Sequence, residues 1–303
     1  MPAKHGTIAV MVFKIQIKME ENMSSYIITN EKLANFERYL WEEEYQSATI
    51  EKYMRNVRFF GVWLSDREIT KETVTQWKAY LQREGYAPCT VNSRLAALNR
   101  FFSFAKLEGC RVKFLHIQRR AFREDRRDLT KEEYARLVTA AKLSGNERLE
   151  LVTETIGGTG IRVSELSYIT VEAVKRGHTM VDLKGKVRMI LLPEKLRKKL
   201  FDYAERNGIR SGEIFRTKSG KGLSRRQIWR EMKELAKKAG VEGSKVFPHN
   251  LRHLFATIFY KACGDIVKLA DVLGHNSIET TRIYLMTTGR EYAQQIDMLG
   301  FVM

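Results

Sequence analysis

The chain has 303 residues, 44% of them hydrophobic, and its 53 Lys and Arg against 36 Asp and Glu give a formal charge of +17. This length is typical of about two folded domains, and the charge favours a nucleic acid or an acidic membrane surface as partner. The apolar run Ile8–Phe13 is too short to span a membrane, and Cys89, Cys110 and Cys263 form no CxxC pair, which argues against a disulfide framework or a zinc site. We therefore expect a basic protein of the cytoplasm.

Residues 1–24 show no helical period, and we expect them to form a disordered extension. After them, apolar residues recur at helical spacing in four segments, with Ser47 and Thr70 as predicted caps of the second and third. The apolar positions are Leu33, Phe36, Leu40; Ile50, Tyr53, Val57, Phe60, Leu64; Val74, Trp77, Leu81; and Val91, Leu95, Leu98, Phe102, Ala105. This pattern predicts a first domain of short amphipathic helices over residues 25–108.

Basic side chains lie between these apolar positions, at Arg55, Arg58, Arg94 and Arg100. They either form a solvated face or contact the phosphates of DNA, and the sequence leaves both interpretations open.

Residues 109–128 carry seven basic side chains against three acidic ones and have no sustained period, which predicts a linker between two domains. A basic linker can lie along a DNA backbone, with Arg119, Arg120 and Arg123 as candidate contacts, so that the two domains close around the duplex. The alternative is a linker that is merely extended and solvated.

A second domain, 129–303, begins where Thr130 and Glu133 have the spacing of a capping box. Helical patterns dominate it, with one exception. Two β-prone runs, Met180–Leu183 and Val187–Leu192, flank Lys184, Gly185 and Lys186, which predicts a hairpin with lysines at its tip. Such a lysine either reaches a ligand held elsewhere or belongs to an ordinary surface turn.

Within "GGTGIRVSEL" (157–166), Arg162 follows a glycine-rich approach and precedes Glu165 by three residues. One interpretation is an exposed ion pair that contributes little to stability. The other is a guanidinium oriented by a carboxylate behind it, which suits bidentate contact with phosphate oxygens.

In "VFPHNLRHLFAT" (246–257), Pro248 favours a helix start, and His249 and Arg252 share one face three residues apart. Cations at a helix N-terminus are unfavourable unless an anion binds there, and phosphate is the obvious candidate.

The stretch "DIVKLADVLGHNSIETTRIYL" predicts a helix from Asp265 to Leu273, a break at Gly274, then His275 and a second helix that carries Tyr284. By itself this segment is similar to a helix-turn-helix DNA reader, which would fit a non-catalytic regulator.

Taken in order, TGIRVSEL, the lysine hairpin, HNLRH, LGH and a tyrosine nine residues after the LGH histidine resemble the tyrosine recombinase and phage integrase family, of the Xer kind. The resemblance covers about residues 30 to 295. It implies a mainly α fold with a small β-hairpin: a four-helix, SAM-like core-binding domain and a mixed α/β catalytic domain.

The resemblance also implies roles for individual residues. Arg162 and Arg252 would clamp the phosphate, His249 and His275 would donate hydrogen bonds and handle protons, and Tyr284 would be the nucleophile. His253 is similar to the family's buried helix histidine. The family's lysine motif is one residue shorter here, as LKGKVR. We therefore choose Lys184 as the proton donor, with Lys186 as the alternative.

The function implied is site-specific DNA recombination through a 3′-phosphotyrosine intermediate, with no metal, ATP or other cofactor. The partners implied are double-stranded DNA with inverted-repeat sites and a tetramer formed on it. In the tail, 286–303, Tyr292, Ile296 and Leu299 share one helical face, which packs on its own domain or docks into a neighbouring subunit. A type IB topoisomerase and the helix-turn-helix regulator are the alternative functions.

Overall fold

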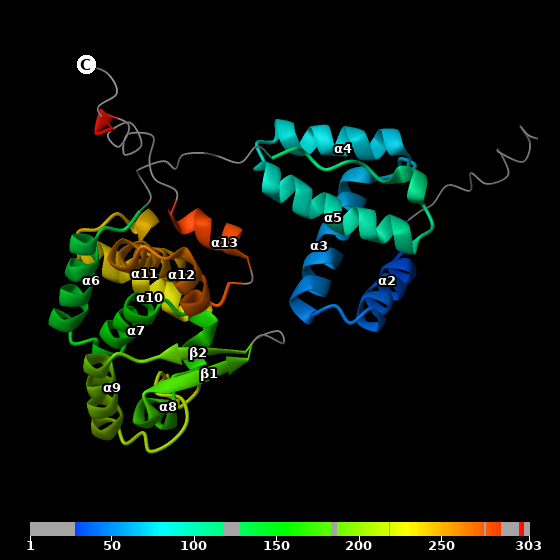
Figure 1. Cartoon of the computed structure of the whole chain (residues 1–303). Helices are drawn as coiled ribbons and strands as arrows, with labels where there is room; N and C mark the ends of the chain where they lie inside the picture. The colour runs from blue at the N-terminus through cyan, green and yellow to red at the C-terminus, as the bar shows by residue number, and fades with distance from the viewer. Residues whose placement is uncertain are drawn as a thin grey trace, which may run out of the picture. The chain divides into compact units, whose positions relative to one another are not determined.

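A computed structural model describes residues 28–117, 128–182, 187–217, 219–275, 277–285 and 297–299. The chain divides into two compact units between residues 119 and 120, and each is considered by itself (Figure 1). Several predictions fall outside the described residues: the extension 1–24, the linker arginines Arg119, Arg120 and Arg123, the hairpin lysines Lys184 and Lys186, and most of the tail 286–303. No helix in the described ranges is long and apolar enough to cross a membrane.

The first unit contains the four predicted helices: α2 (Asn30–Glu42), α3 (Ser47–Leu64), α4 (Lys71–Arg83) and α5 (Pro88–Phe104), followed by the short 3-10 helix η1 (Glu108–Cys110). Thr70 caps α4 as predicted, through reciprocal hydrogen bonds with Thr73. The prediction that Ser47 caps α3 is wrong. The carbonyl of Gln46 already accepts the Ile50 N–H, so the helix begins one residue earlier than the cap rule suggested.

Large aromatic side chains fill the core of this unit, and Phe36, Phe60, Trp77, Phe101 and Phe102 are fully buried. Phe60 meets Trp77 edge to face, with ring centroids 5.1 Å apart. Two asparagines of α5 hold the chain that leaves the unit: the Asn99 side chain bonds both backbone groups of Val112, and Asn92 bonds both of Leu115. The first residues of the predicted linker are thus fixed on α5.

The second unit is mainly helical, as expected. Its helices are α6 (Lys131–Leu143), α7 (Glu147–Thr159), α8 (Val171–Arg176), α9 (Glu194–Arg206), α10 (Arg225–Lys238), α11 (Pro248–Cys263), α12 (Ile266–Leu273) and α13 (Ile278–Arg282). Three 3-10 helices join them: η3 (Val163–Tyr168), η4 (Gly243–Lys245) and η5 (Ile283–Leu285). The capping box of Thr130 and Glu133 is present at α6, and Pro248 is the first residue of α11.

The predicted hairpin is present as β1 (His178–Asp182) and β2 (Val187–Leu191), antiparallel with Met180 opposite Met189. Strand β1 contacts α8 and η3, and β2 contacts α12, so the hairpin lies beside the elements that carry the sequence motifs (Figure 1). This position matters because the residues between the two strands include the candidate lysines.

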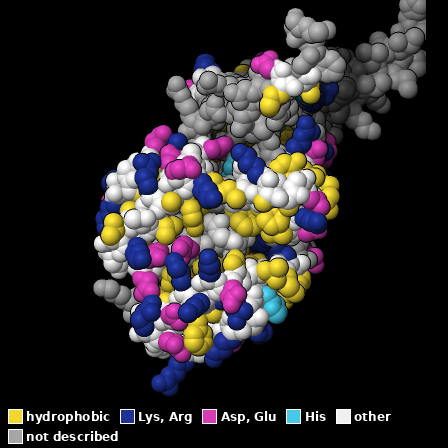
Figure 2. Space-filling model, turned by 60° about the vertical axis from the view of Figure 1, so that its left-hand side comes forward, with side chains coloured by type: hydrophobic (Ala, Val, Ile, Leu, Met, Phe, Trp, Pro, Cys, Tyr) yellow, Lys and Arg dark blue, Asp and Glu magenta, His cyan; other side chains and the backbone are white. Residues whose placement is uncertain are grey.

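On the face drawn in Figure 2, Lys and Arg side chains of the described residues are interspersed with Asp and Glu side chains and with apolar patches. Mixed charge of this kind is typical of a solvated surface. The net positive charge of the protein therefore does not by itself locate a DNA-binding surface on this side.

Candidate active site

Five of the predicted catalytic residues are described, and they lie at the ends of four elements. Arg162 precedes η3, His249 and Arg252 lie in the first turns of α11, His275 follows α12, and Tyr284 is in η5, directly after α13. The segment that resembled a helix-turn-helix thus supplies two of the candidate residues. Contacts among these elements bring the five side chains together.

Arg252 is the central residue of the site and is only 2% exposed. Its Nη1 donates to the carbonyl oxygen of Gly160 at 2.6 Å, and its Nη2 donates to that of Leu273 at 2.7 Å and lies 2.9 Å from Nε2 of His275. Burial, and then the charge of Arg162, lower the pKa of Arg252 to about 10, so it stays protonated at neutral pH. A guanidinium has more N–H donors than these bonds use, which leaves donors for a phosphate.

Arg162 is oriented by Glu165, a carboxylate that is only 1% exposed. The Arg162 amide donates to Oε2 of Glu165 at 2.7 Å and its Nη1 donates to Oε1 at 3.0 Å, while Nη2 donates to the Gly274 carbonyl at 3.3 Å. The Arg162 side chain itself is 42% exposed. A buried carboxylate therefore holds a solvent-accessible guanidinium, which is the second of the two interpretations of this motif.

Two glycines supply backbone carbonyls to the arginines: Gly160 accepts from Arg252 and Gly274 accepts from Arg162. Gly160 and Gly274 end α7 and α12 in the left-handed region, at φ +64° and +63°. A Cβ would lie 2.3 Å from the ring of Phe255 at Gly160 and 2.3 Å from the side chain of Arg188 at Gly274. The glycines of the TGIR and LGH motifs are therefore required both by backbone conformation and by close packing.

His275 is held as one neutral tautomer. Because Arg252 can only donate, Nε2 of His275 accepts, so its Nδ1 carries the proton and donates to Oγ1 of Thr281 at 2.9 Å. Burial, and then the charges of Arg252 and Arg162, lower the pKa of His275 to about 4. Thr281 is fully buried and was not predicted as a site residue; its position three residues before Tyr284 is the only signal for it in the sequence.

Tyr284 lies among three histidine rings and is 7% exposed. Its ring stacks on His275, with centroids 5.4 Å apart and planes 14° apart, and its centroid lies 5.7 Å from that of His249 and 5.2 Å from that of His253. His253 is 6% exposed, and its Nδ1 lies 3.9 Å from a carboxylate oxygen of Asp128. That burial agrees with the expectation of a helix histidine inside the domain.

Arg188 of β2 is a further residue that the sequence analysis missed. Its Nη2 donates to Oε2 of Glu165 and its Nη1 donates to the Val272 carbonyl at 2.6 Å. Burial alone would raise the pKa of Glu165, but the Arg162 amide and the Arg188 guanidinium outweigh it and lower that pKa. Glu165 is therefore ionised and shared between two arginines.

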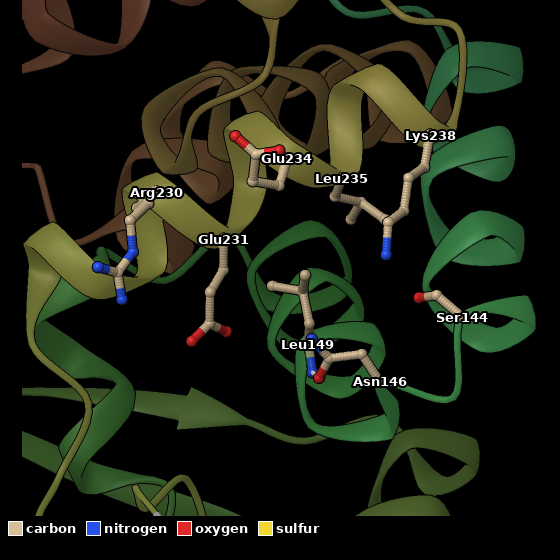
Figure 3. Close-up of a pocket in the computed structure, with 8 residues that line it drawn as sticks. All are labelled: Ser144, Asn146, Leu149, Arg230, Glu231, Glu234, Leu235 and Lys238. Atoms are coloured by element: carbon tan, nitrogen blue, oxygen red, sulfur yellow. Dashed lines mark hydrogen bonds between the residues drawn. The ribbon is translucent and has the colours of Figure 1, made fainter.

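The described residues contain no group of three His, Cys, Asp or Glu side chains placed to hold a metal ion. A pocket of about 350 Å³ lies between α10 and the turn from α6 to α7 (Figure 3). It is lined by Ser144, Asn146, Leu149, Arg230, Glu231, Glu234, Leu235 and Lys238. None of the candidate catalytic residues is among them, so this pocket is separate from the site.

The candidate DNA contacts of the first unit differ in their surroundings. Arg55 and Arg58 are exposed on α3. The Arg94 guanidinium lies over the rings of Phe59 and Tyr86, 4.1 and 4.3 Å from their centroids. Arg100 forms an ion pair with Glu43 and lies over the Tyr39 ring, 5.1 Å from its centroid. Arg94 and Arg100 are thus already engaged within the unit.

Residues 127–290 match the phage integrase family, and residues 33–109 match the phage integrase N-terminal SAM-like domain. The tyrosine recombinase XerA of Thermococcus kodakarensis is 31% identical over 268 residues, 86% of this chain and 92% of that protein. The tyrosine recombinase XerD of Brucella suis is 32% identical over 225 residues, 66% of this chain and 72% of that protein. A lambda integrase tetramer bound to a Holliday junction has a similar fold, with a TM-score of 0.68 at 22% identity over 93% of this chain and 81% of that one. The chain therefore belongs to the phage integrase family and is an Xer-like tyrosine recombinase.

Proposed function

We propose that this enzyme performs site-specific recombination, cutting and rejoining DNA strands through a 3′-phosphotyrosine at Tyr284, without metal or ATP. One observation carries the proposal. The buried guanidinium of Arg252 bonds His275, and His275 stacks on Tyr284, so that a fixed cation, an imidazole and a tyrosine share one site.

The arginines stabilise the transition state of phosphoryl transfer. A phosphodiester carries charge that repels nucleophiles, and this charge spreads over the nonbridging oxygens as the pentacoordinate state forms. Arg162 and Arg252 donate to those oxygens, with His249 as a further donor from the start of α11. Each well-placed donor contributes about 3 kcal/mol in such sites.

Proton transfers accompany the exchange of bonds. The Tyr284 oxygen loses its proton and bonds to phosphorus, while the bond from phosphorus to the 5′-oxygen breaks and that oxygen takes up a proton. His275 is the proposed acceptor, through Nε2, which exchanges its hydrogen bond from Arg252 for one from the Tyr284 hydroxyl when the guanidinium turns to the phosphate. The negative charge of the bound phosphate also opposes the arginines that lower the pKa of His275. The hairpin lysine, Lys184 or alternatively Lys186, is the proposed donor.

The phosphotyrosine bond conserves the energy of the phosphodiester, so the 5′-hydroxyl of another strand can reseal the break by the reverse reaction. Exchange between two duplexes then requires four active sites. We therefore propose inverted-repeat sites and a tetramer on DNA, in line with the lambda integrase tetramer. In this scheme the tail 286–303 docks into a neighbouring subunit, and the cytoplasmic location follows from the DNA substrate.

The two units have different tasks in this proposal. Residues 25–108 form the core-binding domain, with Arg55 and Arg58 on DNA phosphates. The linker 109–128 lies along the backbone through Arg119, Arg120 and Arg123, and the chemistry belongs to 129–303.

The test is incubation with a suicide duplex, nicked so that the cleaved strand cannot be rejoined. We expect a covalent protein–DNA product from the wild type and from Tyr260→Phe, but none from Tyr284→Phe, with DNA binding equal in all three. Tyr260 is a matched control because it packs on the same small cluster as Tyr284. Addition of EDTA should change nothing, whereas a metal requirement would contradict the proposal. Nicking and closing without junction products would favour the topoisomerase alternative.

A further inference from the structure

Arg188 occupies an unusual position for a strand residue. It lies on β2, two residues after Lys186, and its side chain is only 9% exposed. One end of its guanidinium donates to Glu165 and the other to the Val272 carbonyl at 2.6 Å. Its Cδ also fills the space that a side chain at Gly274 would need.

These contacts join three elements that carry candidate catalytic residues. Glu165 belongs to η3 and orients Arg162, Val272 belongs to the last turn of α12 before His275, and β2 leads directly from the hairpin lysines. Arg188 therefore forms hydrogen bonds with η3 and α12, and it is itself part of β2, the third element.

Burial of this cation has an electrostatic cost. Burial lowers the pKa of Arg188, Arg252 and His275, and the charge of Arg162 adds to that lowering for all three. Glu165 is the carboxylate bonded to both Arg162 and Arg188. An apolar side chain of similar volume would fill the same space, but it would leave the buried Glu165 with one guanidinium partner instead of two. What the arginine adds beyond packing is therefore its bond to Glu165.

We propose that Arg188 is a positioning residue that holds Glu165, and through it Arg162, in the orientation that meets the scissile phosphate. Its bond to Val272 fixes the strand after the hairpin tip against the end of α12. This inference rests on the proposed function. Arg188 itself does not contact DNA or the reacting atoms in this scheme.

The experiment compares single-turnover cleavage by Arg188→Met, Arg188→Lys and Arg162→Ala on two suicide duplexes. One has an ordinary scissile phosphate; the other has a methylphosphonate, whose lack of charge reduces the need for a clamping guanidinium. We expect Arg188→Met to cleave the ordinary duplex about 10- to 100-fold more slowly, with the Kd for DNA changed less than about threefold. The loss should be smaller on methylphosphonate, as for Arg162→Ala, and Arg188→Lys should recover part of the rate by bonding Glu165.

A double variant and a matched arginine complete the test. Because both residues act through one clamp, Arg162→Ala with Arg188→Met should be little slower than Arg162→Ala alone. Arg197 also donates from a side chain to a backbone carbonyl, that of Val174, but away from the site, so Arg197→Met should cleave at the wild-type rate.

Three results would overturn the inference: wild-type cleavage by Arg188→Met, equal losses on both duplexes, or losses that add to those of Arg162→Ala. If Arg188→Met does not fold, as judged by its melting curve, Arg188→Gln, which also removes the charge, takes its place in the same comparisons. Wild type and Tyr284→Phe are assayed in parallel. They show whether a negative result contradicts the proposed function or only the positioning role of Arg188. Without covalent product from the wild type the proposed function fails, whereas normal cleavage by both wild type and the Arg188 variants refutes the positioning role alone.

Discussion

The two units hold arginines in different surroundings, half-buried in the first and, at Arg252, fully buried in the second. In the first unit, Arg94 lies between two aromatic rings and Arg100 pairs with Glu43 beside another ring. In the second, Arg252 bonds two backbone carbonyls and an imidazole, and the charges of Arg162 and Arg188 add to burial in lowering its pKa. Rings and one carboxylate offset the charge of the first pair, although Nη1 of Arg94 and Nε of Arg100 have no hydrogen-bond partner among the described residues. The second arrangement has no described carboxylate bonded to Arg252 and gains stability when an anion arrives.

Under the proposed function, this difference separates structural cations from catalytic ones. Rings and a carboxylate offset the charge of Arg94 and Arg100, so their positions are explained by folding. The cluster around Arg252 departs from the rule that buried charges are paired, and such departures are expected where a site binds its substrate. The comparison can be tested by removing one arginine from each region.

The largest expected effect comes from replacing Arg252 of the second unit, with Arg94 of the first unit replaced for comparison. Arg252→Gln should lower the rate of cleavage by about a thousandfold, since it removes a donor to the transition state. Arg94→Gln should leave cleavage by bound enzyme unchanged and lower the free energy of unfolding by about 1 kcal/mol, because it loses its ring contacts. Single-turnover cleavage and urea unfolding measure the two quantities. A similar loss of cleavage from both variants would remove the distinction.

Thr281 sharpens the comparison within the catalytic unit. Thr281→Val keeps the shape of the side chain but removes the acceptor that holds His275, so cleavage should fall about 10- to 100-fold. Thr281→Ser retains the hydroxyl and should stay within a few-fold of the wild type. If valine and serine behave alike, the hydroxyl does not position the imidazole.

Salt dependence tests the exposed arginines of the first unit. Removing one phosphate contact should reduce the slope of log affinity against log salt by about 0.9. Arg55→Ala and Arg58→Ala should each show this change, with affinity lower by several-fold at moderate salt. Arg100→Ala should not, because its guanidinium is engaged with Glu43. Slopes equal to that of the wild type would identify α3 as a solvated face.

A further expected effect concerns stability and pH rather than cleavage or DNA binding. The pKa of His275 falls from 6.5 to about 4 on folding, so between these values the unfolded chain binds more protons than the folded one. The contribution of His275 to stability is therefore complete above pH 6.5 and is lost as the pH falls toward 4. The groups that face it are Arg252, Arg162, Arg188, His249, Tyr284 and Thr281.

Urea unfolding of the wild type and of His275→Gln between pH 4 and 7 isolates this term. The difference in stability between the two proteins should shrink as the pH falls, since glutamine does not titrate. A difference that stays constant over this range would show that His275 is not held neutral.

Local patterns in the sequence predicted most of the fold. Helical spacing located the helices of the first unit, and Thr70, Thr130 and Pro248 marked helix starts, because caps and periodicity depend only on neighbours along the chain. The prediction that Ser47 caps its helix was wrong because the carbonyl of Gln46, one residue earlier, already accepts the first helical hydrogen bond. Such shifts of a single residue depend on packing that a cap rule does not include.

The site could be predicted only in part, for a physical reason. Arg162, His249, Arg252, His275 and Tyr284 stand in recognisable motifs, so resemblance identified them. Arg188 and Thr281 contact the other site residues across the fold or within one turn. Arg188 is the last residue of the quoted LKGKVR motif, but neither that motif nor the helix period indicates its bond to Glu165 or the bond of Thr281 to His275. Nor did any pattern indicate that Arg94 and Arg100 would lie against aromatic rings.

The most direct test of the central claim is to identify the bond between protein and DNA. The covalent product of the suicide duplex would be digested with protease and nuclease and the modified peptide sequenced by mass spectrometry. We expect a nucleotide joined through its 3′-phosphate to Tyr284. Attachment to any other residue, or through a 5′-phosphate, would contradict the proposed site.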